Sequence, residues 1–357
     1  MIKSCYIHIP FCKNICSYCD FCKMYYNKDF INKYLLSLEK EIKLYYKNEV
    51  LNTLYIGGGT PSCLNKKELE KLFEIINIFK LNKTYEFTFE CNIEDINEDL
   101  LIILKKNKVN RISIGLQSFN KKYIEFMNRK YLNKKEITNK INLVKKYFSN
   151  INIDLIYGIN NESMKELQEE VKNFIELDVN HISLYSLILE DNTILKTKKY
   201  KEIDDDLNRK MYDYIRKTLK KNNYIHYEIS NFSKKGYMSK HNLCYWNNDN
   251  YYGFGLGASG FVDNIRYTNT RSLNSYINGN YRYYEEKIDK KRNMEYEMIL
   301  NLRKIKGISK KKFYKKYNLN IKDVFDVSKL NENKYYFYIP KKYLFVENYI
   351  LCDFILD

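Results

Sequence analysis

Three cysteines near the start of the chain have a spacing that suits metal chemistry. Cys12, Cys16 and Cys19 form a C-x3-C-x2-C pattern directly after a short apolar stretch, so one loop can bring three thiolates together. A [4Fe–4S] cluster normally takes four cysteine ligands, and a loop that supplies three leaves one iron open. We favour a cluster whose open iron chelates S-adenosylmethionine through its amino and carboxylate groups.

Two other interpretations of these cysteines stay open at this point. Cys22 could act as a fourth ligand in a zinc knuckle, because closed zinc sites use four nitrogen or sulfur donors. The thiols could also be ordinary buried cysteines. The chain has nine cysteines, and a reducing compartment would disfavour disulfides between them, so metal binding is the stronger expectation.

The length and composition favour one large α/β domain with a small appendage. The chain has 357 residues, of which 45% are hydrophobic, enough for a sizeable core. The first residues do not resemble a secretory signal, and no apolar run approaches the roughly 18–20 residues of a membrane span. We therefore expect a cytoplasmic protein.

The formal net charge of +17 at pH 7 does not predict a nucleic-acid partner. The lysines are scattered along expected helix faces, and no basic block carries an aromatic-interleaved recognition motif. We expect these lysines to be solvated and no nucleic acid to bind. Weak attraction to an anionic membrane surface stays open.

Short apolar runs alternate with helical stretches over the first half of the chain. This alternation predicts repeated β–α units around a parallel sheet. The expected strands are 5–9, 53–56, 86–90, 111–115, 152–156 and 181–187. Helices with the 3.6-residue period are expected near 30–48, 66–78, 97–107, 134–148 and 163–177, and another at 205–222.

Polar and glycine residues gather where these strands end, which is where functional residues of such folds lie. Gly58, Gly59 and Thr60 belong to a GGGTP stretch that lets the backbone approach a ligand, although an ordinary tight turn would look the same. The third, fourth and fifth strands end near Glu90, Gln117 and Asp154, and Arg129 lies one helix beyond Gln117. Asp154 sits among apolar neighbours and therefore needs a hydrogen-bonding partner.

A second cluster of scarce residues lies further along, in the stretch HNLCYW. His241 is one of only four histidines, and Trp246 is the single tryptophan. An imidazole beside aromatic surface suits a porphyrin with an axial histidine. The alternative, a histidine that caps a loop and a tryptophan that fills the core, stays open.

The last part of the chain reads as a separate small module. Helices are expected at 294–303 and 309–317, and short β-like runs at 335–339 and 344–346, a pattern typical of a winged-helix-like unit. We expect a structural or substrate-covering role for it. The predicted division is a core at 1–230, an extension with HNLCYW at 231–290 and this C-terminal module at 291–357.

Several motifs occur together in a characteristic order. They are IHIPFC-x3-C-x2-CDF, GGGTP, SIGLQSF, IDLIYG and YEISNFSKKGYMSKHNLCYW. With them the chain resembles the radical S-adenosylmethionine family of oxygen-independent coproporphyrinogen III oxidases, and most closely its heme-chaperone branch. The resemblance covers nearly the whole chain. It implies a partial (β/α)6 TIM-like barrel, open on one side, with the cluster and S-adenosylmethionine at its mouth.

The resemblance also implies roles for individual residues. Cys12, Cys16 and Cys19 would hold the [4Fe–4S] cluster, and Cys22 would stay off it. His241 would be the heme ligand. The S-adenosylmethionine pocket would be formed by Tyr6, Gly58, Gly59, Thr60, Glu90, Gln117, Arg129 and Asp154.

The two branches of this family differ in function. The oxidases convert propionate side chains to vinyls by oxidative decarboxylation, whereas the chaperones bind finished heme and deliver it to respiratory hemoproteins. Asp20 and Phe21 follow the third cluster cysteine here, where the oxidase has a fourth cysteine two positions on. This difference and the presence of HNLCYW favour a heme chaperone without coproporphyrinogen oxidase activity, and the oxidase is the alternative.

Overall fold

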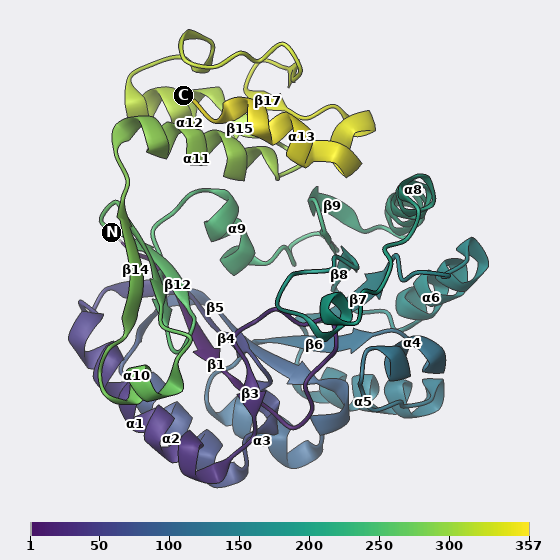
Figure 1. Cartoon of the computed structure of the whole chain (residues 1–357), viewed down its shortest axis with the longest axis vertical. Coiled ribbons are helices and arrows are strands. Elements are labelled where there is room, and N and C mark those ends of the chain that lie inside the picture. Colours follow the sequence, from purple (N-terminus) through teal and green to yellow (C-terminus); the bar gives the residue numbers. More distant parts are fainter. Residues whose placement is uncertain (1, 357) are drawn as a thin grey trace.

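A curved sheet of nine strands forms the centre of the molecule. The computed structural model describes residues 2–356 and shows this sheet with helices along its outer side (Figure 1). Six strands run parallel, and their spatial order follows the chain. They are β1 (Ser4–Ile9), β4 (Val50–Gly58), β5 (Lys80–Asn92), β6 (Arg111–Gln117), β7 (Ile151–Tyr157) and β8 (His181–Ser186). The predicted six-stranded partial barrel is confirmed.

The helices between these strands cover the outer face of the sheet. They are α1 (Lys28–Tyr45), α2 (Lys66–Ile76), α3 (Glu98–Lys106), α4 (Lys121–Phe126), α5 (Lys134–Tyr147) and α6 (Met164–Glu176). Three of them start with a capping box, in which Asn65, Asn133 or Ser163 accepts a hydrogen bond from the backbone of a glutamate three residues on. That glutamate bonds back to the cap residue, so local sequence sets where these helices begin.

The barrel interior is polar, which is unusual for this architecture. Along β6, Ile112, Ile114 and Leu116 are buried in the core, whereas Arg111, Ser113, Gly115 and Gln117 line a cavity inside the barrel. Successive side chains of a strand point to opposite faces, so this alternation separates core from cavity. Barrel interiors are ordinarily filled with branched apolar side chains. A polar interior instead leaves space for a polar ligand.

The sheet continues at both edges with segments from later in the chain. β11 (Tyr252–Phe254) pairs in parallel with β1, and β10 (Asn231–Ser233) pairs antiparallel with β8. β9 (Ile225–Glu228) completes that second edge, after α7 (Ile194–Thr197) and α8 (Asp205–Lys221). The sheet therefore extends beyond residue 230, where we predicted that the core ends.

The segment from 231 to 290 is fastened to the barrel through a buried carboxylate. Besides β10, β11 and α9 (Lys240–Trp246), it contains β12 (Ser259–Val262), β13 (Ile265–Asn269), α10 (Leu273–Ile277) and β14 (Arg282–Lys287). Glu41 on α1 is fully buried and accepts hydrogen bonds from the Gly255 N–H (2.8 Å), the Asn269 Nδ2 atom (2.6 Å) and the Tyr276 hydroxyl (2.5 Å). One side chain thus connects the first helix to three parts of this segment.

The C-terminal module is a small sheet with helices. It contains α11 (Lys290–Leu302), β15 (Ile308–Ser309), α12 (Lys310–Tyr317), β16 (Asn331–Glu332), β17 (Tyr336–Tyr338) and α13 (Glu347–Leu351), with its strands in the order β15-β17-β16. The strand predicted at 344–346 is wrong, because Lys341–Val346 is a 3-10 helix that leads into α13. Leu344, Glu347 and Ile350 are buried at every third position, which is a helical period and not a strand period. Within residues 2–356, no helix is long and apolar enough to cross a membrane.

Candidate functional site

The predicted functional residues meet at a cavity inside the barrel. Its volume is about 330 Å³. The lining includes ten of the residues predicted from the sequence, namely Cys12, Cys16, Cys19, Gly58, Gly59, Thr60, Glu90, Gln117, Arg129 and Asp154. Residues from the ends of β4, β5, β6 and β7 thus converge on one space, as parallel strands of a barrel require.

The cysteine loop covers one side of this cavity and is closed by a short strand pair. Cys12 ends β2 (Phe11–Cys12), which pairs in parallel with β3 (Met24–Tyr25) just after the loop. Ser17 fastens the middle of the loop to the end of α4. Its backbone N–H donates to the Met127 carbonyl (3.1 Å), and its hydroxyl donates to the Phe126 carbonyl (2.8 Å). These two hydrogen bonds fix the position of the cysteine loop relative to α4.

Polar hydrogens are directed at two of the cysteine sulfurs. The Thr60 hydroxyl donates to the Cys12 Sγ atom at 3.4 Å, and the Arg129 guanidinium donates to the Cys16 Sγ atom at 3.7 Å. Burial raises the pKa of the Cys12 thiol to about 11, so an uncompensated thiolate is costly there. Donors and a positive charge near the sulfurs stabilise thiolates that bind iron, as hydrogen bonds to cluster sulfurs do.

Cys12, Cys16 and Cys19 line the cavity, whereas Cys22 does not. Within residues 2–356, no three His, Cys, Asp or Glu side chains are grouped so that they could hold a single metal ion. A cluster spreads its cysteine ligands over different irons, whereas zinc needs four donors around one ion at about 2.0–2.3 Å. Cys22 packs elsewhere, since a Cβ atom on Gly257 would lie 3.0 Å from its Sγ atom. That Cys22 stays off the cluster remains a prediction.

The glycines at the end of β4 leave room for neighbouring side chains at the cavity. Gly58 has a φ of +112°, and a Cβ atom there would lie 2.5 Å from the His8 ring. A Cβ atom on Gly57 would lie 2.6 Å from the Glu90 carboxyl carbon. Any side chain would therefore clash or strain the turn, which only glycine avoids. The close approach of this loop to a ligand stays a prediction.

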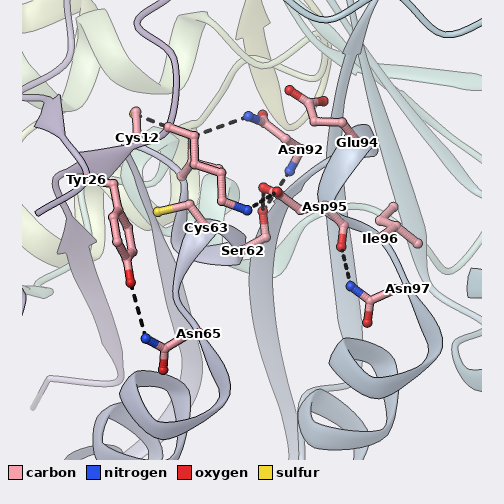
Figure 2. Close-up of polar contacts among 12 residues, drawn as sticks. Cys12, Tyr26, Ser62, Cys63, Asn65, Asn92, Glu94, Asp95, Ile96 and Asn97 are labelled. Carbon is pink, nitrogen blue, oxygen red and sulfur yellow. Dashed lines mark hydrogen bonds and ion pairs between the residues drawn. The ribbon is translucent and has the colours of Figure 1, made fainter. Parts of the chain in front are cut away.

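A chain of hydrogen bonds connects the loop after β4 to the end of β5 (Figure 2). Figure 2 shows Ser62, Asn92 and Asp95 close together beside Cys12. The Asn92 backbone N–H donates to the Ser62 hydroxyl oxygen (3.0 Å), and that hydroxyl donates to Asp95 (2.9 Å). Lys13, next to Cys12, forms an ion pair with Asp95 at 2.8 Å. These contacts hold the first cluster cysteine and the rim of the barrel in a common framework.

Two carboxylates line the cavity, and both accept hydrogen bonds from residues of the barrel strands. Glu90 accepts hydrogen bonds from the Tyr55 hydroxyl (2.7 Å) and the Gly58 N–H (3.0 Å), and burial raises its pKa to about 7. Asp154 accepts one from the Asn152 Nδ2 atom (2.9 Å), and burial raises its pKa as well. The partner that Asp154 was expected to need is present.

Arg129 and Gln117 complete the cavity wall above these acids. Arg129 is buried and donates to the Asn92 side-chain oxygen (3.1 Å) and to the Gly115 carbonyl (2.9 Å). Gln117 ends β6 with a φ of +69°, where the register with β7 shifts. The shift is a local irregularity of the kind that redirects a side chain at a barrel rim.

Two predicted site residues lie outside the cavity lining. The Tyr6 hydroxyl is hydrogen-bonded to the His8 Nδ1 atom at 3.0 Å. His241, on α9, is buried, and both of its ring nitrogens have partners: Nδ1 with the Thr53 hydroxyl (2.8 Å) and Nε2 with the Tyr245 hydroxyl (2.7 Å). Burial lowers the pKa of His241 to about 3, so the ring is neutral. His241 contacts β4 through Thr53 and is 1% exposed in this structure.

Comparison with known proteins decides the family. A model of the radical SAM superfamily matches residues 6–174. The heme chaperone HemW of Lactococcus lactis is 40% identical over 331 residues, covering 90% of this chain and 87% of that protein. The chain belongs to the HemW family. The HemW of Bacillus subtilis is 36% identical, covering 91% of this chain and 89% of that protein.

A solved structure agrees with the fold of this HemW family member. The coproporphyrinogen III oxidase HemN of Escherichia coli, a radical SAM enzyme, aligns with a TM-score of 0.86 over 99% of this chain and 90% of that one. At 20% sequence identity this likeness concerns the fold. Membership of the radical SAM superfamily implies a [4Fe–4S] cluster and S-adenosylmethionine as cofactors.

Some cavity residues of this HemW family member were missed by sequence reasoning. Tyr55, Arg111, Asn152 and Tyr185 line the same space but belong to strand interiors and starts, where no function was expected. The two-residue period of the strands could have revealed these residues. Counting back by two from Gly115 places Arg111 on the cavity face, and counting back by two from Asp154 places Asn152 there.

Proposed function

We propose that this protein binds heme and delivers it to hemoproteins, respiratory enzymes among them. The observation that carries the proposal is the match to curated relatives named heme chaperone HemW, at 36–40% identity over about nine-tenths of the chain. The polar barrel cavity supports a cofactor-dependent role. The net charge of +17 favours weak association with an anionic membrane, where respiratory enzymes lie.

We assign the cluster to Cys12, Cys16 and Cys19, whose sulfurs border the cavity. A cluster held by these cysteines would supply one-electron chemistry toward S-adenosylmethionine. The glycine loop at Gly58 and Gly59 would admit the methionyl part beside Thr60. Glu90, Gln117, Arg129 and Asp154 would bind its polar groups, and Tyr6 would support that wall from behind.

The proposal predicts saturable heme binding without porphyrinogen turnover. Titration of the anaerobically reconstituted protein with heme should give a Soret band that saturates at one heme per chain. Incubation with coproporphyrinogen III, S-adenosylmethionine and a reductant should give no decarboxylated product by chromatography. Conversion over many turnovers would contradict the chaperone proposal and establish the oxidase function instead.

We propose His241 as the heme ligand. For this role, one of its ring nitrogens must give up its present hydrogen bond. Its Nε2 atom must leave the Tyr245 hydroxyl before it can bind iron. Tyr245→Phe removes this competing partner, so we expect heme to bind about two- to tenfold more tightly, the equivalent of one hydrogen bond. His241→Ala should shift the Soret band, because the iron loses its ligand.

The same two variants test the structural alternative. His241 also connects α9 to β4 through Thr53, so its removal could act on stability alone. Unchanged heme affinity in Tyr245→Phe, with an unchanged Soret band and a lower thermal midpoint in His241→Ala, would assign His241 to the core. A different residue would then have to bind the iron.

A further inference from the structure

A buried guanidinium lines the cavity without a partner for its Nε atom. Arg111 starts β6 and is 2% exposed, and it belongs to the cavity lining. Its Nε–H has no hydrogen-bond partner, and no carboxylate of residues 2–356 lies within ion-pair distance of the guanidinium. An unpaired charge in the interior costs several kcal/mol, so such a group calls for an anion.

The acids of the cavity do not meet this demand. Glu90 and Asp154 are close enough for the positive charge of Arg111 to oppose the rise in their pKa values. Their oxygens are nevertheless bonded to Tyr55, Gly58 and Asn152. Arg111 therefore keeps donors that the barrel does not use.

A second donor without a partner lies on the neighbouring strand. Thr88 on β5 is the backbone register partner of Arg111, is fully buried outside the cavity lining, and has a hydroxyl without a hydrogen-bond partner. The other cavity arginine differs, because Arg129 donates to Asn92 and to the Gly115 carbonyl. Arg111 is thus the cavity arginine whose donors are free for a ligand among the described residues.

The chemistry of this guanidinium selects a carboxylate. Guanidinium presents its N–H donors in a planar fork that matches the two oxygens of a carboxylate. We propose that Arg111 is a carboxylate-binding residue of the cavity and fixes an acidic group of the bound ligand. This inference rests on the proposed function, in which the ligands are heme, with two propionates, and S-adenosylmethionine, with one carboxylate.

The depth of Arg111 favours the propionate as the source. Gly115, beside Arg129 and the cluster loop, lies four residues further along β6, about 13 Å at the rise of a strand. A carboxylate that chelates the cluster stays at the level of that loop. A heme propionate is not tied to the cluster, so this limit does not apply to it.

The test compares ligands with and without their carboxylates. Heme and heme dimethyl ester, whose propionates are blocked, are titrated into wild type, Arg111→Met and Arg111→Lys. S-adenosylmethionine and its decarboxylated form are titrated in parallel. We expect Arg111→Met to weaken heme binding tenfold or more while it leaves dimethyl ester binding nearly unchanged. Arg111→Lys keeps the charge but loses the fork, so its heme affinity should lie between those of wild type and Arg111→Met. It replaces the Met variant in the test if that variant does not fold.

Every outcome of this comparison decides the proposal. Arg292→Met, which removes a surface charge paired with Glu295, is the control and should leave all four affinities unchanged. If Arg111→Met weakens binding only of S-adenosylmethionine, and not of its decarboxylated form, Arg111 binds a carboxylate but the ligand is S-adenosylmethionine. If the affinities for the acid and the blocked ligands fall equally, or do not fall, the proposal is wrong. Wild type that binds no heme would refute the heme function, and the S-adenosylmethionine titration would still test Arg111.

Discussion

Serine in place of Cys12 is expected to leave the purified protein without an iron–sulfur cluster. Cys12 is buried at the end of β2, where its sulfur accepts from Thr60. A serine hydroxyl at this position is a poor iron ligand, and two remaining cysteines do not retain a cluster. We expect the broad visible absorbance of the cluster and its bound iron to be lost, as measured after anaerobic reconstitution by spectroscopy and iron analysis. Cys16→Ser and Cys19→Ser should behave alike.

Cys22→Ser provides the matched control for this loss. Cys22 lies in the same segment but packs against Gly257, outside the cavity lining. This variant should keep full iron content and the spectrum of the wild type. A full cluster in Cys12→Ser, or its loss in Cys22→Ser, would show that Cys22 is a ligand and that the assignment of the three cysteines is wrong.

Alanine in place of Glu41 should lower the free energy of unfolding by about 3–5 kcal/mol, the usual cost of breaking a buried charged network. The change leaves the Gly255 N–H, the Asn269 amide and the Tyr276 hydroxyl without their acceptor. It also removes the carboxylate that faces Arg282 at 3.8 Å. Denaturant unfolding followed by circular dichroism measures the loss.

A second glutamate on the same helix makes the comparison specific. Glu39 is two residues away, faces solvent and pairs with Lys43 on the surface. Glu39→Ala should cost less than about 0.5 kcal/mol, as exposed pairs do. Similar losses for both variants would mean that the buried network does not explain the effect, and helix propensity could not explain it either, because alanine is the better helix former. Glu41→Gln, which keeps one acceptor oxygen, should fall between the two.

Much of the barrel was predictable because its signals are local. Each expected strand and helix of the first half is a stretch whose own periodicity sets its type, and β4, β5 and β6 contain the predicted ranges. The convergence of Gly58, Glu90 and Gln117 followed from a general property of parallel strands. Boundaries were less accurate, because strands such as Lys80–Asn92 extend through polar residues that carry no hydrophobic signal.

The remainder depends on pairing between remote segments. No local pattern shows that Tyr252–Phe254 adds to the edge of β1, or that α9 buries its histidine against Thr53. The scarcity of histidine drew attention to His241, but scarcity does not reveal that both ring nitrogens are already bonded. Arg111 was overlooked because it lies at the start of a strand, and its lack of a partner is visible only in three dimensions.

The position of β1 inside the sheet has a consequence for the order of folding. β1 is made first, yet one of its two neighbours is β11, which follows nearly the whole barrel in the chain. Until β11 has left the ribosome, β1 presents an unpaired edge, which is open to wrong pairing. Contacts so distant in sequence also slow folding. The cysteine loop next to β1 therefore reaches its final surroundings late, and the cluster is best inserted after synthesis of the chain is complete.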